Sequence, residues 1–303
     1  MLTLSPILGF RGELAALSAA FLWAVSTVVY GRLGGRLAPL VLNLAKGVIA
    51  IAFILLTLFL RGDFLPRLPG SALGLLLLSG AVGIGLGDTA YFAALNHLGA
   101  RRALLMESLA PPLAAVLALL FLSEQLQLQA WMGILLTVLG VAWVITERVP
   151  ITTQISTHPL SGVGFGMLAA LGQASGAVLS RAALANTTID PLWSALLRLV
   201  AGVLVLLVWI YGQKRSQQWF EPLGSMRIVG GVAIASCLGT YLAIWLQQIS
   251  LKYAAAGIAQ ALSAISPLFV LPIAVWSGER VSLRAIAGVI IALGGVWLLL
   301  SQS

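Results

Sequence analysis

The sequence predicts an all-α polytopic membrane protein in which ten transmembrane helices form two inverted five-helix repeats. Three observations predict this class. The 303 residues are 60% hydrophobic and only 9% charged, whereas a soluble domain carries about 25% charged residues to cover its surface. The apolar residues gather in runs long enough to cross a bilayer, which takes about 20 residues. Rarer residues inside these runs recur, in the same order, in the second half of the chain.

The five spans of the first half are separated by Pro, Gly and charged residues. They are predicted at 12–31, 39–60, 71–96, 100–122 and 128–146. No small-residue cleavage signal follows a short apolar core at the N-terminus, so the first run is expected to remain as a span. Glu147 ends the last of these runs.

A polar, Pro-containing stretch from Glu147 to Ser161 divides the chain near its middle. Five further apolar runs follow it. They are predicted as spans at 161–183, 191–211, 227–249, 254–277 and 283–301. The predicted organisation is therefore a first repeat at 1–148, a linker at 149–160 and a second repeat at 161–303.

The two halves align through residue types that are rare inside apolar runs. The matched pairs are Pro39 with Pro191, Lys46 with Arg198, Gly87 with Gly239, Pro112 with Pro267, Glu124 with Glu279, Gly133 with Gly288 and Gly140 with Gly295. Chance explains Leu or Ala matches in apolar sequence more readily than it explains these. An odd number of spans per half makes the second half cross the membrane upside down. Inverted repeats of this kind place a binding site near the bilayer midplane.

The most specific motif is Ser108-Leu-Ala-Pro-Pro112, which is followed by Ser123-Glu124 and recurs as Ser263-Ala-Ile-Ser-Pro267. With the segment from Gly87 to Leu95, it resembles the drug/metabolite transporter superfamily, in particular its EamA-type ten-helix branch. The resemblance covers essentially the whole chain and is specific for the fold but weak for the substrate. It implies a transporter of small solutes, since relatives export amino acids and other metabolites, and it implies cytoplasmic termini.

The basic residues do not agree with that orientation. The net charge is +8, and more Lys and Arg fall on the side opposite the termini than on the side of the termini. The positive-inside rule would therefore place both termini outside, and both orientations stay open. Because the basic residues occur in ones and twos between apolar runs, they are interpreted as interface anchors and not as a nucleic-acid surface.

Neither a cofactor nor an enzymatic site is predicted. The single cysteine, Cys237, lies in an apolar run, which excludes a disulfide framework or a Cys-based metal site. No His-Glu-x-x-His or Gly-x-Ser-x-Gly motif occurs, and both histidines, His97 and His158, fall in predicted loops. The chain is therefore expected not to be an enzyme.

Four charged residues fall inside predicted spans: Lys46, Asp88, Glu107 and Arg198. Each costs at least about 2.5–3.5 kcal/mol at a helix centre, so such residues usually face a polar cavity or a partner. Asp88 and Glu107 each lie about ten residues from the turn between the third and fourth helices. At about 1.5 Å per residue both carboxylates should lie roughly 15 Å deep. Lys46 is a candidate partner for either one.

These positions give the candidate site. Lys46 and Arg198 are predicted to clamp a carboxylate or phosphate, and Asp88 and Glu107 to couple transport to an ion or proton. The remaining candidates for substrate binding are Trp23, Tyr91, Gln173, Tyr241 and Gln247. Pro111, Pro112 and Pro267 are predicted helix hinges. Each role has an alternative. Lys46 and a carboxylate could form a purely structural pair, the prolines could make static kinks, and the aromatic residues could serve in packing. Pairs of Gly four apart, such as Gly83 with Gly87, are expected to allow close helix packing.

The predicted function is that of a secondary carrier or exporter of a small metabolite such as an amino acid, by alternating access around a midplane cavity. A proton-coupled exporter of cationic drugs and a flippase for a lipid-linked substrate are the alternatives. The expected partners are a small-molecule substrate and the lipid bilayer, without nucleic acid, and the chain is compatible with a monomer or a homodimer. The expected location is the plasma (inner) membrane.

Overall fold

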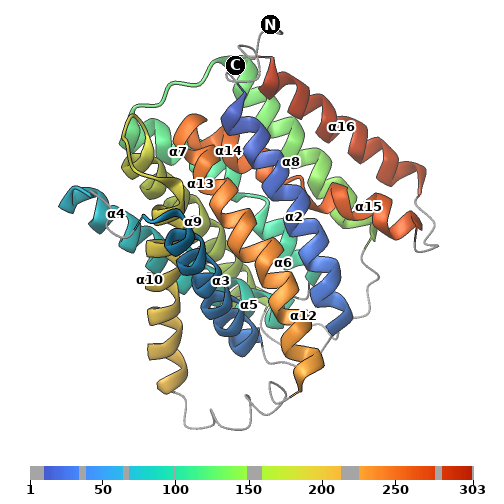
Figure 1. Cartoon of the computed structure of the whole chain (residues 1–303). Helices are drawn as coiled ribbons and strands as arrows, with labels where there is room; N and C mark the ends of the chain where they lie inside the picture. Colours follow the sequence, from blue (N-terminus) through green and yellow to red (C-terminus); the bar gives the residue numbers. More distant parts are fainter. Residues whose placement is uncertain are drawn as a thin grey trace, which may run out of the picture.

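The computed structural model describes residues 10–33, 39–63, 68–98, 100–148, 159–212, 225–276 and 282–301, and every element within these ranges is a helix (Figure 1). The first half contains α2 (Arg11–Leu33), α3 (Pro39–Arg61), α4 (Gly70–Gly80), η1 (Ala81–Gly87), α5 (Asp88–Leu98), α6 (Ala100–Glu107), α7 (Ala110–Leu122) and α8 (Leu128–Arg148). The second half contains α9 (Pro159–Leu184), α10 (Pro191–Tyr211), α12 (Met226–Ser236), η3 (Cys237–Leu242), α13 (Ala243–Tyr253), α14 (Ala256–Ser263), α15 (Ser266–Trp276) and α16 (Leu283–Leu300).

The two halves repeat the same series of elements. Each begins with two uninterrupted helices, α2 and α3 or α9 and α10. Next comes a helix with a π-helical middle, η1 in the first half and η3 in the second. A helix broken in two follows, α6–α7 or α14–α15, and each half closes with one uninterrupted helix, α8 or α16. The repeat predicted from Pro, Glu and Gly matches is therefore present in the structure, interruptions included.

Contacts at one end of the bundle establish that the repeats are inverted. Arg61 at the end of α3 pairs with Asp190 just before α10, at 3.6 Å. Gln129 at the start of α8 donates a hydrogen bond to Ser301 just after α16, at 2.5 Å. At this end, α3 finishes where its counterpart α10 begins, and α8 begins where its counterpart α16 finishes. We call it the ion-pair end.

Nine helices in the described ranges are long and apolar enough to cross a membrane. They correspond to the predicted spans except 254–277. That span is divided between α14 and α15, and its apolar helical stretch, Ala256–Pro272, is shorter than the others. The total of ten spans stays a prediction. Most of the predicted linker (149–158) and Glu279 lie outside the described residues, but α9 already begins at Pro159, so the linker ends earlier than predicted.

The recurring glycines lie where helices of the two halves pack most closely. In Figure 1, α8 and α16 run side by side, and a Cβ at Gly140 would collide with the backbone of Ala292. Likewise, a Cβ at Gly295 would collide with Thr137. Small residues let helix backbones approach each other, and in lipid this van der Waals packing replaces the hydrophobic drive.

A second glycine contact holds η1 against α9. A Cβ at Gly172 would lie 2.9 Å from the Cα of Gly87, and one at Gly176 would lie 3.0 Å from the Cα of Gly83. The prediction that these Gly-x-x-x-Gly pairs allow close packing is confirmed. Because Gly87 immediately precedes Asp88, this contact also sets the position of the Asp88 carboxylate.

Candidate functional site

The centre of the candidate site is an ion pair inside the first half. Lys46 on α3 lies with its Nζ 3.7 Å from Oδ2 of Asp88, the first residue of α5. The side chains are 27% and 22% exposed. The separation is longer than a charge-assisted hydrogen bond of about 2.8 Å. Both groups therefore keep hydrogen-bonding capacity for a third group.

Arg198 brings a second cation to this pair from the other half. The Arg198 residue is 3% exposed, and its guanidinium interacts electrostatically with Asp88. Arg198 can lie this close to α4 and η1 because the residues that face it there are glycines, which have no side chain. A Cβ at Gly80 would collide with the Arg198 backbone, and one at Gly83 would lie 3.4 Å from Nη2. Nε and Nη1 of Arg198 are buried without a hydrogen-bond partner among the described residues.

Glu107 and Tyr91 complete the charged cluster. Glu107, the last residue of α6, interacts electrostatically with both Asp88 and Lys46. Tyr91, three residues after Asp88 on α5, interacts with the same two carboxylates. We call Lys46, Asp88, Tyr91, Glu107 and Arg198 the charged cluster. The structure thus brings together all four of the charged residues predicted to lie inside spans.

The charges in this cluster balance, with two cations and two carboxylates. A buried charge needs a partner, because burying it alone is expensive. Lys46 and Asp88 partner each other, although at a long distance. The Arg198 guanidinium is partnered less well, because two of its nitrogens have no acceptor in the described structure. Such an arrangement can bind a carboxylate or another small anion, and it can exchange protons at the two acids.

One π-helical segment, η1, and the helix break between α6 and α7 adjoin this cluster. Asp88 directly follows η1, and Glu107 is the last residue before the break between α6 and α7. π-Helical segments occur often at functional sites because the extra residue per turn redirects side chains. The Gly83-Ile-Gly-Leu-Gly87 run was the sequence signal for this feature. By its sequence alone, that run predicts close helix packing and not a π-helical segment.

Two of the other predicted residues lie next to structural features of the site. The backbone nitrogen of Gln173 on α9 would lie 3.6 Å from a Cβ at Gly87, and the Gln173 carbonyl accepts a hydrogen bond from Gln260 at 3.4 Å. Trp23 on α2 faces the equivalent glycine of the second half, because a Cβ at Gly239 would lie 3.8 Å from its ring.

Tyr241 is engaged in packing between the halves. Its hydroxyl shares a hydrogen bond with the Thr57 hydroxyl at 2.8 Å. Its ring stacks between Phe53 and Trp245, with centroids 5.9 Å and 6.1 Å away. The hydroxyl and the ring of Tyr241 therefore both have partners within the protein, so this tyrosine is explained by packing and does not require a bound ligand.

On α13, the glutamine that faces α10 is Gln248. Gln248 is fully buried, and its Oε1 accepts a hydrogen bond from Ser194 at 2.9 Å. Its neighbour Gln247, the residue predicted from the sequence, is half-buried. A helix turns about 100° per residue, so adjacent glutamines face different neighbours.

The predicted hinge prolines lie at the helix breaks. Pro111 and Pro112 are the second and third residues of α7, and Pro267 is the second residue of α15. Proline is tolerated in the first turn of a helix, where its missing N–H is not needed. The prolines therefore mark equivalent breaks in the two halves, which is the geometry a hinge requires. Movement at them stays a prediction.

A second cluster of polar contacts joins the two halves at the ion-pair end. Nε of Arg181, near the end of α9, donates to Oε1 of Glu124 at 2.5 Å, and both side chains are 16% exposed. Nη1 of Arg181 donates to the carbonyls of Leu251 and Lys252 at 3.1 Å and 2.8 Å. Oε2 of Glu124 accepts the backbone N–H of Ala256 at 3.0 Å. We call these five residues the latch. Glu124 was predicted only as a repeat signature, because nothing in the sequence identifies Arg181 as its partner.

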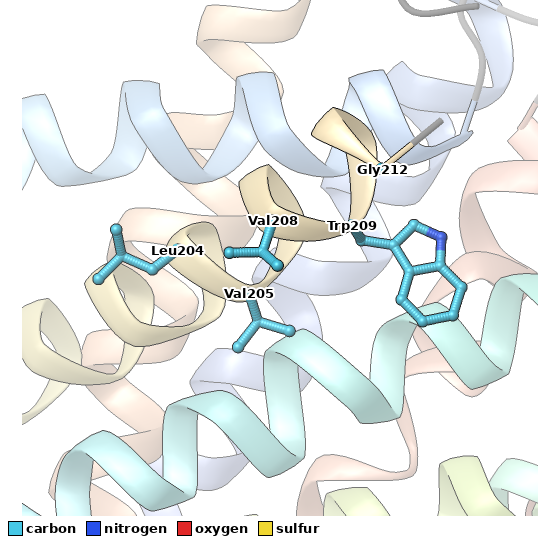
Figure 2. A pocket seen from close by; sticks show the side chains of 5 residues that line it. All are labelled: Leu204, Val205, Val208, Trp209 and Gly212. Carbon is cyan, nitrogen blue, oxygen red and sulfur yellow. The ribbon is translucent and has the colours of Figure 1, made fainter. Parts of the chain in front are cut away.

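The hollow shown in Figure 2 lies on α10, toward the end opposite the ion-pair end. Its lining is apolar and consists of Leu204, Val205, Val208, Trp209 and Gly212. No residue of the charged cluster lines it, so it is not the predicted polar cavity. Within the described ranges, no group of three or more His, Cys, Asp or Glu side chains is arranged to hold a metal ion.

Comparisons with known proteins agree with this architecture. A model of the EamA-like transporter family matches residues 10–146 and 160–301, one match for each half. An uncharacterized protein of Pseudomonas aeruginosa is 34% identical over 145 residues, and the match spans about half of each chain, 48% in both cases. A solved crystal structure superimposes with a TM-score of 0.79, covers 96% of this chain and 97% of its own, and is 18% identical. That last likeness concerns the fold alone.

Proposed function

Because the chain belongs to the EamA-like transporter family, we propose that it is a secondary carrier or exporter of a small metabolite with an acidic group, such as an amino acid. Members of this family are multi-pass membrane transporters of the drug/metabolite type and not enzymes. The proposal here concerns the substrate, the binding residues and the mechanism.

One observation carries the proposal: two buried guanidinium nitrogens of Arg198 have no hydrogen-bond acceptor among the described residues. The guanidinium is a permanent cation, and the residue is 3% exposed. Asp88, the acid with which Arg198 interacts, is already paired with Lys46. An unpaired buried charge is costly, and a carboxylate placed between Arg198 and Lys46 removes that cost. Glu107 then remains for an ammonium group or for a proton.

Alternating access is supported by the distribution of ion pairs. In the described structure, both ion pairs that link the two halves lie at the ion-pair end, Arg61–Asp190 and Glu124–Arg181. At the other end, the described contacts between halves include the stacked rings of His97 and Phe165, 5.7 Å apart. Opening toward the ion-pair end requires both pairs to break. We therefore infer that this conformation is closed at that end and that the halves rock about the charged cluster.

The first experiment is a thermal-shift screen of purified protein with amino acids, other small carboxylates and lipophilic cations. The expected result is stabilisation by amino acids or related carboxylates. Stabilisation by lipophilic cations alone would reject this substrate class in favour of a drug exporter. Binding that requires an acyl chain would favour the flippase alternative.

The second experiment measures uptake of the best ligand into proteoliposomes. Arg198→Gln removes the unpaired charge and is expected to abolish specific uptake, while Arg198→Lys keeps the charge and retains a fraction of it. Arg227→Gln is the matched control, because Arg227 is exposed on α12 and outside the charged cluster. Equal uptake by Arg198→Gln and Arg227→Gln would reject the proposed role of Arg198.

A further inference from the structure

Asn43 is a buried polar residue that the sequence analysis did not single out. It lies on α3, three residues before Lys46, so the two side chains share one face of the helix. Asn43 is 1% exposed. Its side chain is close enough to Asp88 to interact with the carboxylate. Even so, neither its Nδ2 nor its Oδ1 has a partner of acceptable hydrogen-bond geometry among the described residues.

An amide buried in this way calls for an explanation. Nearly all buried polar groups in native proteins are hydrogen-bonded, and an unsatisfied one bears its full desolvation penalty. Asn43 leaves both a donor and an acceptor unsatisfied, so repacking around it with apolar groups would stabilise the protein. Arg198, which has two unsatisfied nitrogens, interacts electrostatically with the same Asp88 carboxylate. Two buried side chains near one carboxylate therefore keep unused hydrogen-bonding groups, which a bound polar molecule would satisfy.

The charges and the amide together restrict what that molecule is. Lys46 and Arg198 balance Asp88 and Glu107, so a ligand of zero net charge leaves the cluster neutral. A simple anion or cation would bury one uncompensated charge. The Asn43 amide adds one acceptor and two donors, which complement an ammonium group and a carboxylate on the same molecule.

We propose that Asn43 is a specificity-determining residue of the charged cluster and that it selects a zwitterion, such as an α-amino acid, over the corresponding simple carboxylate or amine. This inference rests on the proposed function and narrows it. The Asn43 Nδ2 donates to the ligand carboxylate beside Arg198, and Oδ1 accepts from the ligand ammonium group beside Asp88. The repeat counterpart of Asn43 is Ala195, so only the first half supplies this amide.

The test compares matched ligands that differ by one charged group. Three sets serve: alanine with propionate and ethylamine, leucine with 4-methylpentanoate and 3-methylbutylamine, and phenylalanine with 3-phenylpropionate and 2-phenylethylamine. Binding to purified full-length protein is measured by isothermal titration, and the melting temperature without ligand is recorded. The wild type is expected to prefer the zwitterion in at least one set.

Asn43→Ala is expected to weaken binding of that zwitterion about tenfold, which corresponds to about 1.4 kcal/mol, and to weaken binding of the simple carboxylate less, because the simple carboxylate loses only the hydrogen bond from Nδ2. Its melting temperature without ligand is expected to equal or exceed that of the wild type, because an unsatisfied amide has been removed. Asn96→Ala is the matched control, since Asn96 is exposed on α5. It is expected to change neither quantity.

The outcomes separate this inference from the proposed function. If the wild type prefers a zwitterion and Asn43→Ala keeps the same preference, Asn43 is not a specificity residue, although the proposed function stands. If the wild type binds no member of any set but binds lipophilic cations, the proposed function itself fails. If Asn43→Ala and the smaller change Asn43→Ser both melt well below the wild type, Asn43 is a structural residue and the inference is wrong.

Discussion

The latch offers the most quantitative prediction about how the transporter opens. Glu124→Gln keeps the shape of the side chain but removes the charge that holds Arg181 at 2.5 Å. Breaking a buried ion pair by removing one partner costs about 3–5 kcal/mol. Because the two side chains are 16% exposed and the Gln oxygen still accepts one hydrogen bond, we expect about 2 kcal/mol. The opening equilibrium at the ion-pair end should then shift about 30-fold, at about 1.4 kcal/mol per tenfold change.

The assay is cysteine alkylation in a protein whose native cysteine is replaced by Cys237→Ser. Ser250→Cys supplies the reporter, since Ser250 is fully buried beside the latch residues Leu251 and Lys252. A membrane-impermeant maleimide reaches it only when the ion-pair end opens. The alkylation rate is therefore expected to rise about 30-fold in Glu124→Gln.

The matched control for this experiment is the second pair at the same end. Arg61 and Asp190 are 43% and 33% exposed at 3.6 Å, and exposed pairs contribute about 0.2–1 kcal/mol. Arg61→Gln should raise the rate by no more than about fivefold. If Glu124→Gln does not exceed Arg61→Gln, the latch does not distinguish closed from open states, and the reasoning is refuted.

Three further predictions concern the acids, the glycine contacts and the aromatic stack. Asp88→Asn and Glu107→Gln are expected to abolish pH-driven uptake into proteoliposomes while passive exchange survives; unchanged pH dependence in both variants would remove proton coupling. Gly140→Ala should destabilise the protein by about 2 kcal/mol through overpacking against Ala292, as measured by thermal denaturation in detergent. Gly164→Ala should be neutral or mildly stabilising, because a Cβ there meets nothing within 4 Å; equal destabilisation of the two variants would contradict close packing as the cause. Tyr241→Phe should cost about 1 kcal/mol through loss of the hydrogen bond with Thr57 and should leave uptake intact; loss of uptake would instead indicate a direct role in binding substrate.

Composition and internal repetition were sufficient to predict a membrane protein of two similar halves. Long apolar runs indicate directly that the helices are surrounded by lipid, because a helix that crosses the bilayer must be mostly apolar over its length. The recurring residues were informative because they occupy positions with strict local requirements. Pro112 and Pro267 lie at equivalent helix breaks, and Gly140 and Gly295 lie where a Cβ would collide with the facing helix. The depth argument for Asp88 and Glu107 stays a prediction, although the two carboxylates do interact electrostatically with each other.

The pairing of side chains was decided only by the tertiary structure. The sequence left Lys46 free to pair with Asp88 or Glu107, and the structure pairs it with Asp88. It offered no sign that Glu124 meets Arg181, that Thr57 occupies the Tyr241 hydroxyl, or that Asn43 stays without a partner. Each contact depends on the rotation and offset of two helices far apart in the chain. A change of one residue in register turns a side chain by about 100°, and no local pattern specifies that rotation.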